Sequence, residues 1–414
     1  MKVSLKNHIN PTRAIAAPVL TAGLLACTLS GTASAQSLTE DIASMISGGT
    51  TKIDLRYRYE NVEQDNALDD ADASTLRTRI SFQSATVNKF ALALQVDNIM
   101  TIGPDDYDSL VLDKYRGNTS VIADPVGTEI NIAALSYAID EGKSLTIGRQ
   151  RVNHADQRFL GSVGWRQNEQ TLDALSYSYK EGSTSIDYSY IWNVNRIFKG
   201  TKTSIQPTDF DSNSHALLVS NTQDWGSISG FVYAFDFENG AGASSITYGL
   251  KYSGTVGSVN LNASIATQSD HGDNPTSYDA NYYSFDAGTK LGSISLKAGI
   301  EVLGSDDGVA AFATPMATLH KWQGFADLYL GTPANGIEDL YLTASTAISG
   351  VSLAATYHDF SADEGSADYG DELDLVIGYT INPNVNIQAK FAFYDADTVA
   401  VDTDKFWLSL NMSF

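Results

Sequence analysis

Four arginines in two neighbouring segments are the side chains of this chain best suited to binding chemistry. Arg56 and Arg58 alternate with apolar residues, and Arg77 and Arg79 do so in the next such segment. Guanidinium groups form paired hydrogen bonds with carboxylates, so arginines gathered on one face favour an anionic solute. The opposing possibility is that acids of the intervening segment, 61–74, fold onto the arginines and neutralise them; these acids are Asp65, Asp69, Asp70 and Asp72.

Catalytic motifs are missing from the sequence. The chain contains no G-x-S-x-G, H-E-x-x-H, G-x-x-x-x-G-K-[ST] or G-x-G-x-x-G pattern. His154 near Asp156 and His320 near Asp327 have no serine in a recognisable arrangement, and we interpret both as polar loop histidines. The sequence therefore predicts no enzyme activity, no cofactor and no metal site. A hydrolytic enzyme and an adhesive protein are retained as alternatives, which assays of hydrolysis and of ion conductance would separate.

Charge and cysteine content exclude further classes. The 26 basic and 49 acidic residues give a formal net charge of −23, which argues against a nucleic-acid partner. The single cysteine, Cys27, lies in the N-terminal segment described next, so we expect no disulfide and no thiolate site in the mature protein.

The N-terminus has the pattern of a secretory signal. Residues 1–35 begin with basic residues, continue with an apolar stretch and end at Ala33-Ser34-Ala35. A lipoprotein cleavage site before Cys27 is the alternative. We expect 1–35 to be a signal peptide, 36–50 a periplasmic N-terminal segment and 51–414 a transmembrane barrel. Nothing in 36–414 approaches the 18 or so apolar residues of a membrane helix, so we expect any crossing to be made by strands.

Alternation of apolar and polar residues is the dominant pattern of the chain. Residues 51–60 are typical, with Ile53, Leu55, Tyr57 and Tyr59 alternating with charged residues. The other such segments bring the predicted number of strands to about 18, and they are 75–85, 89–97, 128–139, 143–151, 170–180, 183–194, 214–222, 225–236, 244–253, 256–268, 277–290, 292–303, 337–347, 350–359, 371–380, 384–395 and 403–414.

The connections between these segments alternate in length. Links after even-numbered segments are tight, as at 140–142 and 181–182, whereas most links after odd-numbered segments are long, as at 98–127 and 304–336. This alternation is typical of bacterial outer-membrane barrels, with short periplasmic turns and long extracellular loops. The predicted fold class is all-β, an antiparallel transmembrane β-barrel.

Alternation also predicts which side chains line the lumen. A Lys or Arg facing lipid at the bilayer midplane costs roughly 2–4 kcal/mol, so the charged face of each strand must point inward. The side chains assigned to the lumen on this rule are Lys52, Asp54, Arg56, Arg58, Arg77, Arg79, Asp187, Lys251, Lys297, Glu301 and Lys390.

Arg149 and Arg151 break the rule, because they share a face with Leu145 and Ile147. Either the strand bulges there or the two arginines lie above the membrane.

Loop 304–336 is the best candidate for a constriction, because 33 residues exceed the needs of a turn. It contains Trp322 and Phe325, and residues 316–330 could form a short helix. Whether the loop folds inward or caps the mouth is left open. With these two aromatic residues we group Arg149, Arg151 and Arg166 as candidates for a constriction or mouth.

The final strand carries an apolar face that ends at the C-terminus. This face consists of Phe406, Leu408, Leu410, Met412 and Phe414. A terminal Phe in such a strand resembles the signal that outer-membrane barrels present to the barrel assembly machinery.

Two stretches indicate a family. Residues 147–174 contain IGRQRVNH and GWRQNEQTLDA, and residues 313–342 contain ATPMATLHKWQGFAD and GIEDLYL. Both resemble patches of the alginate-export family of outer-membrane proteins. The resemblance implies an 18-stranded monomeric barrel with a charged lumen that passes anionic polysaccharide.

Together these patterns predict a monomeric channel in the outer membrane of a Gram-negative bacterium, surrounded by lipid and lipopolysaccharide. We expect it to mediate diffusion of small or oligomeric hydrophilic solutes, with uronate-like anions or saccharides as first choice. Export of an alginate-like polysaccharide is the alternative.

Overall fold

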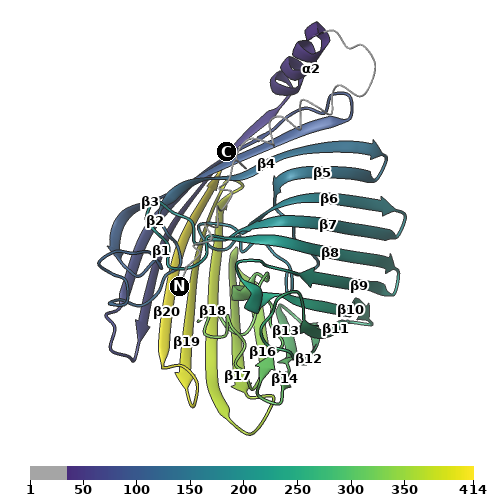
Figure 1. Cartoon of the computed structure of the whole chain (residues 1–414). Helices are drawn as coiled ribbons and strands as arrows, with labels where there is room; N and C mark the ends of the chain where they lie inside the picture. Colours follow the sequence, from purple (N-terminus) through teal and green to yellow (C-terminus); the bar gives the residue numbers. More distant parts are fainter. Residues whose placement is uncertain (1–34) are drawn as a thin grey trace, which may run out of the picture.

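The structure, a computed structural model that describes residues 35–414, is a closed antiparallel barrel of 18 strands (Figure 1). Consecutive strands pair along the chain, β13 pairs with β16, and β1 pairs with β20 to close the ring. The predicted fold class and strand number are confirmed. Of the predicted signal peptide, all but Ala35 lies outside the described residues.

The strands are longer than the sequence segments that predicted them, because several continue beyond the apolar alternation. Loop 61–74, for example, shrinks to the few residues between β1 and β2. The bounds are β1 Thr50–Gln64, β2 Ala71–Gln83, β3 Phe90–Asp106, β4 Gly127–Asp140, β5 Lys143–Gln150, β6 Thr171–Glu181, β7 Thr184–Asn195, β8 Asp209–Gln223, β9 Gly226–Phe235, β10 Ser245–Val256, β11 Val259–Asp270, β12 Asp279–Leu291, β13 Ile294–Leu303, β16 Ile337–Ile348, β17 Val351–Ser361, β18 Asp368–Asn382, β19 Val385–Ala396 and β20 Thr403–Ser413.

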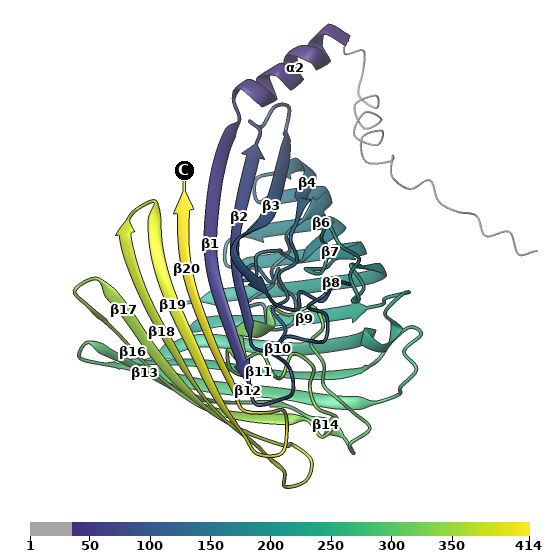
Figure 2. The ribbon, with the colours of Figure 1, turned by 90° about the vertical axis from the view of Figure 1, so that its left-hand side faces the viewer.

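Within residues 35–414, three short elements and one small hairpin accompany the barrel. Helix α2 precedes β1 and stands at the end of the barrel that carries the short turns (Figure 2). The hairpin β14–β15 and the turn η2 lie between β13 and β16. The bounds are α2 Ala35–Ser47, η1 Ala241–Ala243, β14 Ser305–Asp306, β15 Ala310–Ala311 and η2 Leu319–Lys321.

Side chains alternate between the two faces of the wall as predicted. On β2, Ile80 is 49% exposed on the outside, whereas Arg77 and Arg79 on the opposite face are 4% and 8% exposed. On β20, Trp407 and Ser409 are buried inside, and the predicted outward side chains end at Phe414, which is exposed. The apolar outer face and the buried charged inner face are those of a barrel whose outside contacts lipid.

Part of the lumen is apolar, which the alternation rule did not predict. Phe231 and Tyr233 on β9 and Tyr282 on β12 are buried together with Phe159 and Phe312 from two long loops. Large inward-facing rings are stable there because loop residues cover them and keep water out.

The two loops that cover these rings form one unit, which we call the plug and define as residues 151–170 and 304–336. The Gly161 amide donates to the Met316 carbonyl at 2.8 Å, and the Thr318 amide donates to the Gln157 carbonyl at 3.0 Å. Side chains reinforce the contact, since the Val163 amide donates to Thr318 Oγ1 at 3.0 Å. Loop 304–336 therefore folds inward, which resolves the choice between an inward loop and a cap.

The helix predicted over 316–330 is wrong, and only the single turn η2 forms there. Gln323, Gly324 and Asp327 all have positive φ angles, which no continuous right-handed helix contains. Backbone amides that a helix would satisfy internally are bonded instead to side chains of the barrel wall.

Candidate functional site

The four arginines of the first two strands meet on the inner wall. Arg56 on β1 lies directly opposite Arg77 on β2 in the strand register. Arg58, Arg77 and Arg79 are all less than one-tenth exposed. The predicted convergence of these side chains is therefore present, but their partners differ from those considered from the sequence.

Arg79 is fully neutralised by carboxylates. It forms a bidentate pair with Asp97 on β3, with distances of 2.8 and 2.6 Å, and a second pair with Glu169 of the plug at 2.6 Å. Arg151 also binds Glu169. The acids of 61–74 do not neutralise the arginines, so that alternative is wrong; Asp72, for example, accepts a hydrogen bond from Tyr59.

Arg56 and Arg58 hold the plug through its backbone. Arg56 Nη1 donates to the carbonyl oxygens of Gly164, Trp165 and Arg166 at 3.0–3.2 Å. Arg58 Nη2 donates to the Trp165 carbonyl at 2.7 Å. A guanidinium bound to carbonyls keeps its full positive charge, unlike one bound to a carboxylate.

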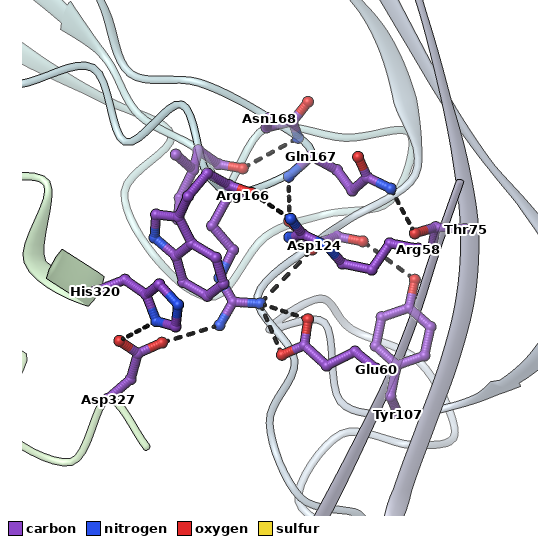
Figure 3. Close-up of polar contacts among 12 residues, drawn as sticks. Arg58, Glu60, Thr75, Tyr107, Asp124, Arg166, Gln167, Asn168, His320 and Asp327 are labelled. Atoms are coloured by element: carbon purple, nitrogen blue, oxygen red, sulfur yellow. Dashed lines mark hydrogen bonds and ion pairs between the residues drawn. The ribbon is translucent and has the colours of Figure 1, made fainter. Parts of the chain in front are cut away.

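Arg166 of the plug binds carboxylates from three other segments of the chain (Figure 3). Its Nη1 lies 3.0 Å from Glu60 on β1 and 3.6 Å from Asp124, and its Nη2 lies 3.4 Å from Asp327. The Gln167 amide donates to Asp124 at 2.9 Å, which fixes the loop between β3 and β4 to the plug. Arg166, proposed from sequence as a constriction residue, is the centre of this network.

A stack of rings and cations crosses the joint between the two plug loops. The ring of Trp165 stacks on His320 with centroids 3.4 Å apart, and His320 stacks on Phe325 at 4.9 Å. Arg166 lies 4.1 Å from the Trp165 centroid, and Lys390 lies 4.0 Å from that of Phe325. Cations over both ends of the stack are attracted by the ring faces.

A cavity of about 130 Å³ lies beside this stack against the inner wall. Its lining combines cations, indole rings and neutral hydrogen-bonding groups, with Trp165 as the plug residue. The lining residues are Arg56, Arg58, Trp165, Gln388, Lys390, Trp407, Ser409 and Asn411.

The wall behind the cavity carries uncompensated positive charge. Among the described residues, four inward cations on the adjacent strands β19, β20, β1 and β2 have no carboxylate within 4.0 Å: Lys390, Lys405, Arg56 and Arg77. We call these four the basic wall. Arg58, by contrast, has Asp124 at 4.0 Å.

The remaining predicted lumen residues are spread around the barrel. Lys52 pairs with Asp54 at 2.8 Å near the start of β1, and Lys297 lies 4.8 Å from the Tyr341 centroid. Asp187 accepts a hydrogen bond from Ser178 at 2.8 Å. These side chains do not belong to the cavity.

Two predicted lumen residues anchor the plug. Glu301 on β13 binds Arg158 at 2.6 Å, and Arg158 also donates to Thr314. Lys251 on β10 binds Asp156. Both wall residues therefore have structural partners and are not free to bind a solute.

The two arginines that broke the alternation rule have different positions. The register of β5 is unbroken from Ile147 to Arg149, so Arg149 stays on the outward face, where it pairs with Asp173 at 2.8 Å. Arg149 is therefore not at the constriction. Arg151 follows the end of β5 and turns inward to Glu169 and Gln95.

Of the two aromatic plug residues predicted from sequence, Phe325 belongs to the ring stack. Trp322 lies away from the cavity, with Arg158 at 5.4 Å from its centroid.

Burial sets the protonation of the plug. It lowers the pKa of His320 to about 3, despite the neighbouring Asp327, and the pKa of His154 to about 4. Burial also opposes the charge of Glu169, but Arg79 and Arg151 outweigh it and lower the pKa of this carboxyl. The histidines are thus neutral and Glu169 is ionised at neutral pH.

No helix within 35–414 is long and apolar enough to cross a membrane. Over the same residues, no group of three or more His, Cys, Asp or Glu side chains is arranged to hold a metal ion.

Comparisons with known proteins place the fold among porins. The sequence matches no family model and no curated protein sequence. Among solved structures, Pseudomonas aeruginosa OccK9 (OpdG) is similar with a TM-score of 0.69 at 15% identity, covering 90% of this chain and 99% of that one. Acinetobacter baumannii OccAB2 gives 0.68 at 14% identity, with coverage of 90% and 99%. P. aeruginosa OpdK, solved with vanillate, gives 0.66 at 13% identity, with coverage of 89% and 99%.

These likenesses establish the architecture of the chain, an 18-stranded porin-type barrel. The resemblance to the alginate-export family stays a prediction.

Several residues of the site were missed from the sequence. Lys405, Trp407 and Ser409 carry a detectable signal, because they alternate with the apolar residues of the last strand and so share the lumen face. Asp124 and Trp165 carry no such signal, since their positions depend on how long loops fold.

Proposed function

We propose that this protein is a channel of the bacterial outer membrane for the diffusion of small hydrophilic anions. The observation that carries the proposal is the 130 Å³ cavity between Trp165 of the plug and two cations of the basic wall, Arg56 and Lys390. A carboxylate solute passing the plug would exchange its water for guanidinium and ammonium donors that lack carboxylate partners. Field focusing by the low-dielectric wall strengthens their combined effect.

The size of the cavity favours small solutes over a polymer. The plug fills the lumen opposite the basic wall with packed aromatic residues, and two loops would have to move to admit a polysaccharide chain. Vanillate, with which OpdK was solved, is itself a small carboxylate. Export of an alginate-like polymer remains the second candidate, supported by the sequence resemblance.

The outer face of the barrel indicates what surrounds the protein. Exposed apolar side chains such as Ile80 and Leu250 would contact outer-membrane lipid and lipopolysaccharide, with the chain acting as a monomer. We propose that Phe406–Phe414 is read by the barrel assembly machinery. The Phe414 amide and carbonyl also bond Ile53 at 2.9 Å, so the same segment closes the barrel.

The test is the ion selectivity of the purified protein in planar bilayers. Replacing Lys390 and Lys405 by Gln should shift the reversal potential in a KCl gradient toward cations, with a several-fold loss of anion preference. The shift should shrink in 1 M salt, where the Debye length is about 3 Å.

The control for charge removal away from the cavity is Lys114→Gln, which removes one positive charge from an exposed loop between β3 and β4. It should leave the reversal potential unchanged. An unaltered potential in the double variant, with the barrel correctly inserted, would refute the anion channel.

A further inference from the structure

Helix α2, Ala35–Ser47, has an apolar flank that no described part of the protein covers. Ile42 and Ile46 lie one helical turn apart and are 47% and 59% exposed. Leu38 and Met45 are half-buried on the adjoining side. The opposite side is polar and includes Glu40 and Ser44, so the helix is amphipathic.

The helix is attached to the rim of the barrel by specific contacts. The Ala85 amide donates to the Met45 carbonyl at 3.0 Å, and the Asn88 side chain donates to Asp41 at 2.9 Å. Both partners belong to the short turn between β2 and β3. Figure 2 shows α2 beyond this end of the barrel, next to the ends of β1, β2 and β3.

The junction between α2 and β1 lies on the outer side of the wall. A Cβ added at Gly49 would lie 2.5 Å from the ring of Phe82, and one at Gly48 would lie 2.9 Å from Ala85. Phe82 alternates with the inward Ser81, which accepts a hydrogen bond from Gln95, and so faces outward with Ile80. The two glycines let the backbone pass directly against the lipid-facing belt.

From this geometry we infer that α2 is an interfacial anchor, whose Ile42 and Ile46 insert into the phospholipid leaflet on the periplasmic side of the membrane. The inference rests on the proposed outer-membrane location. The glycine junction at the end of α2 packs on the outward ring of Phe82, at the edge of the lipid-facing surface of β2. An amphipathic helix at such a boundary lies in the interface with its apolar side in the acyl region.

Charge makes the proposal more specific. The helix contains Glu40 and Asp41 and no basic residue. Anionic lipid therefore cannot attract it, and apolar insertion must carry the binding. Attachment should therefore not strengthen as the fraction of anionic phospholipid rises.

The experiment uses single cysteines in the full-length mature protein, which contains no other cysteine if the predicted signal is removed. Ile42→Cys, Ile46→Cys and the control Ser44→Cys are labelled with an environment-sensitive fluorophore. The proteins are reconstituted in phosphatidylethanolamine vesicles, with and without phosphatidylglycerol. Labels at 42 and 46 should be blue-shifted and quenched by lipid-attached quenchers, whereas the label at 44 should report water in both compositions.

Water-like emission at all three positions would overturn the anchor. So would a blue shift at 42 and 46 that grows with protein density and resists lipid-attached quenchers, because a second copy would then cover the flank. Conductance is recorded from the same vesicles. Its absence, with lipid quenching intact, would count against the channel and leave the anchor standing.

Discussion

At the scale of single residues, the same side-chain type has two roles in this lumen. Arg79 lies between Asp97 and Glu169, whereas the partners of Arg56 among the described residues are neutral oxygens. The first is a structural ion pair that fixes the plug, and the second leaves net charge for a solute. Alternation places both side chains inward but does not distinguish these roles, since the partners come from distant loops.

Replacing Arg79 by Met should destabilise the barrel. Asp97 is fully buried, and removing one partner of a buried ion pair typically costs 3–5 kcal/mol. Asp97 keeps Asn131 and Glu169 keeps Arg151, so we expect a loss of about 3 kcal/mol. The urea midpoint of the heat-modifiable folded form measures the loss.

The control for this variant is Lys202→Met, which breaks a pair with Asp113 in which the lysine side chain is 52% exposed. Its cost should stay below about 1 kcal/mol. Equal midpoints for the two variants would show that the Arg79 cluster does not stabilise the fold.

His320 should make the plug sensitive to acid. Its folded pKa, about 3, lies below the ordinary value of 6.5, so the packed plug excludes a proton that an unpacked plug binds. Stability from this group is therefore complete above pH 6.5 and is lost as the pH falls toward 3. Current noise in planar bilayers should rise between pH 6.5 and 4.

Buried His154 acts in the same direction, because burial also lowers its pKa. The comparison is therefore with His320→Phe, which retains the ring stack and cannot be protonated. Its noise should rise less on acidification than that of the unaltered protein. An identical rise in both proteins would show that protonation of His320 does not cause the increase in current noise.

At the scale of elements, the plug is fixed to the wall by backbone contacts with two carboxylates of β18. The Ala326 amide donates to Glu372 at 2.8 Å, and the Phe325 amide donates to Asp374 at 3.1 Å. Gly324 makes this approach feasible, because its φ is +79° and a Cβ there would lie 2.3 Å from the Glu372 carboxylate.

Gly324→Ala should therefore loosen the plug. A non-glycine residue in this conformation costs roughly 1–3 kcal/mol, and the collision with Glu372 adds to it. We expect larger or more variable single-channel conductance with an unchanged barrel. Gly331→Ala is the control, since a Cβ there meets nothing within 4 Å. Identical conductance in both variants would mean that this contact does not hold the plug.

At the scale of the whole molecule, strand pairing fixes which loops share one end. Because all neighbouring strands are antiparallel, the tight turns lie at one end with both barrel termini, and the long loops lie at the other. The proposed orientation puts the long loops outside the cell.

Cysteine labelling on intact cells tests this orientation. Cysteines at the exposed loop positions Asp70 and Glu364 should react with an impermeant thiol reagent, and one at Ser258, in the turn between β10 and β11, should stay protected until the cells are opened. The reverse labelling pattern would show that the barrel has the opposite orientation in the membrane.

The sequence alone determined the wall of this protein. Alternation has a period of two, and each strand contacts only its neighbours, so the number of strands and their topology follow from local patterns. The cost of charge in lipid selects the inner face, which gives the inward orientation of Arg56, Arg77 and Lys390. The alternation pattern did not predict the apolar inner patch at Tyr233, because the loop residues that cover this patch are far away in the sequence.

Only the tertiary structure decided the interior. Loops that are far apart in sequence meet there, as Trp165 and His320 do, and which acid neutralises which arginine depends on that meeting. Loop folding is governed by individual hydrogen bonds and positive φ angles, as at Gly324, which leave no period in the sequence. The cavity and its uncompensated charge are therefore properties of the folded chain, whereas the barrel around them is already specified in the sequence of its strands.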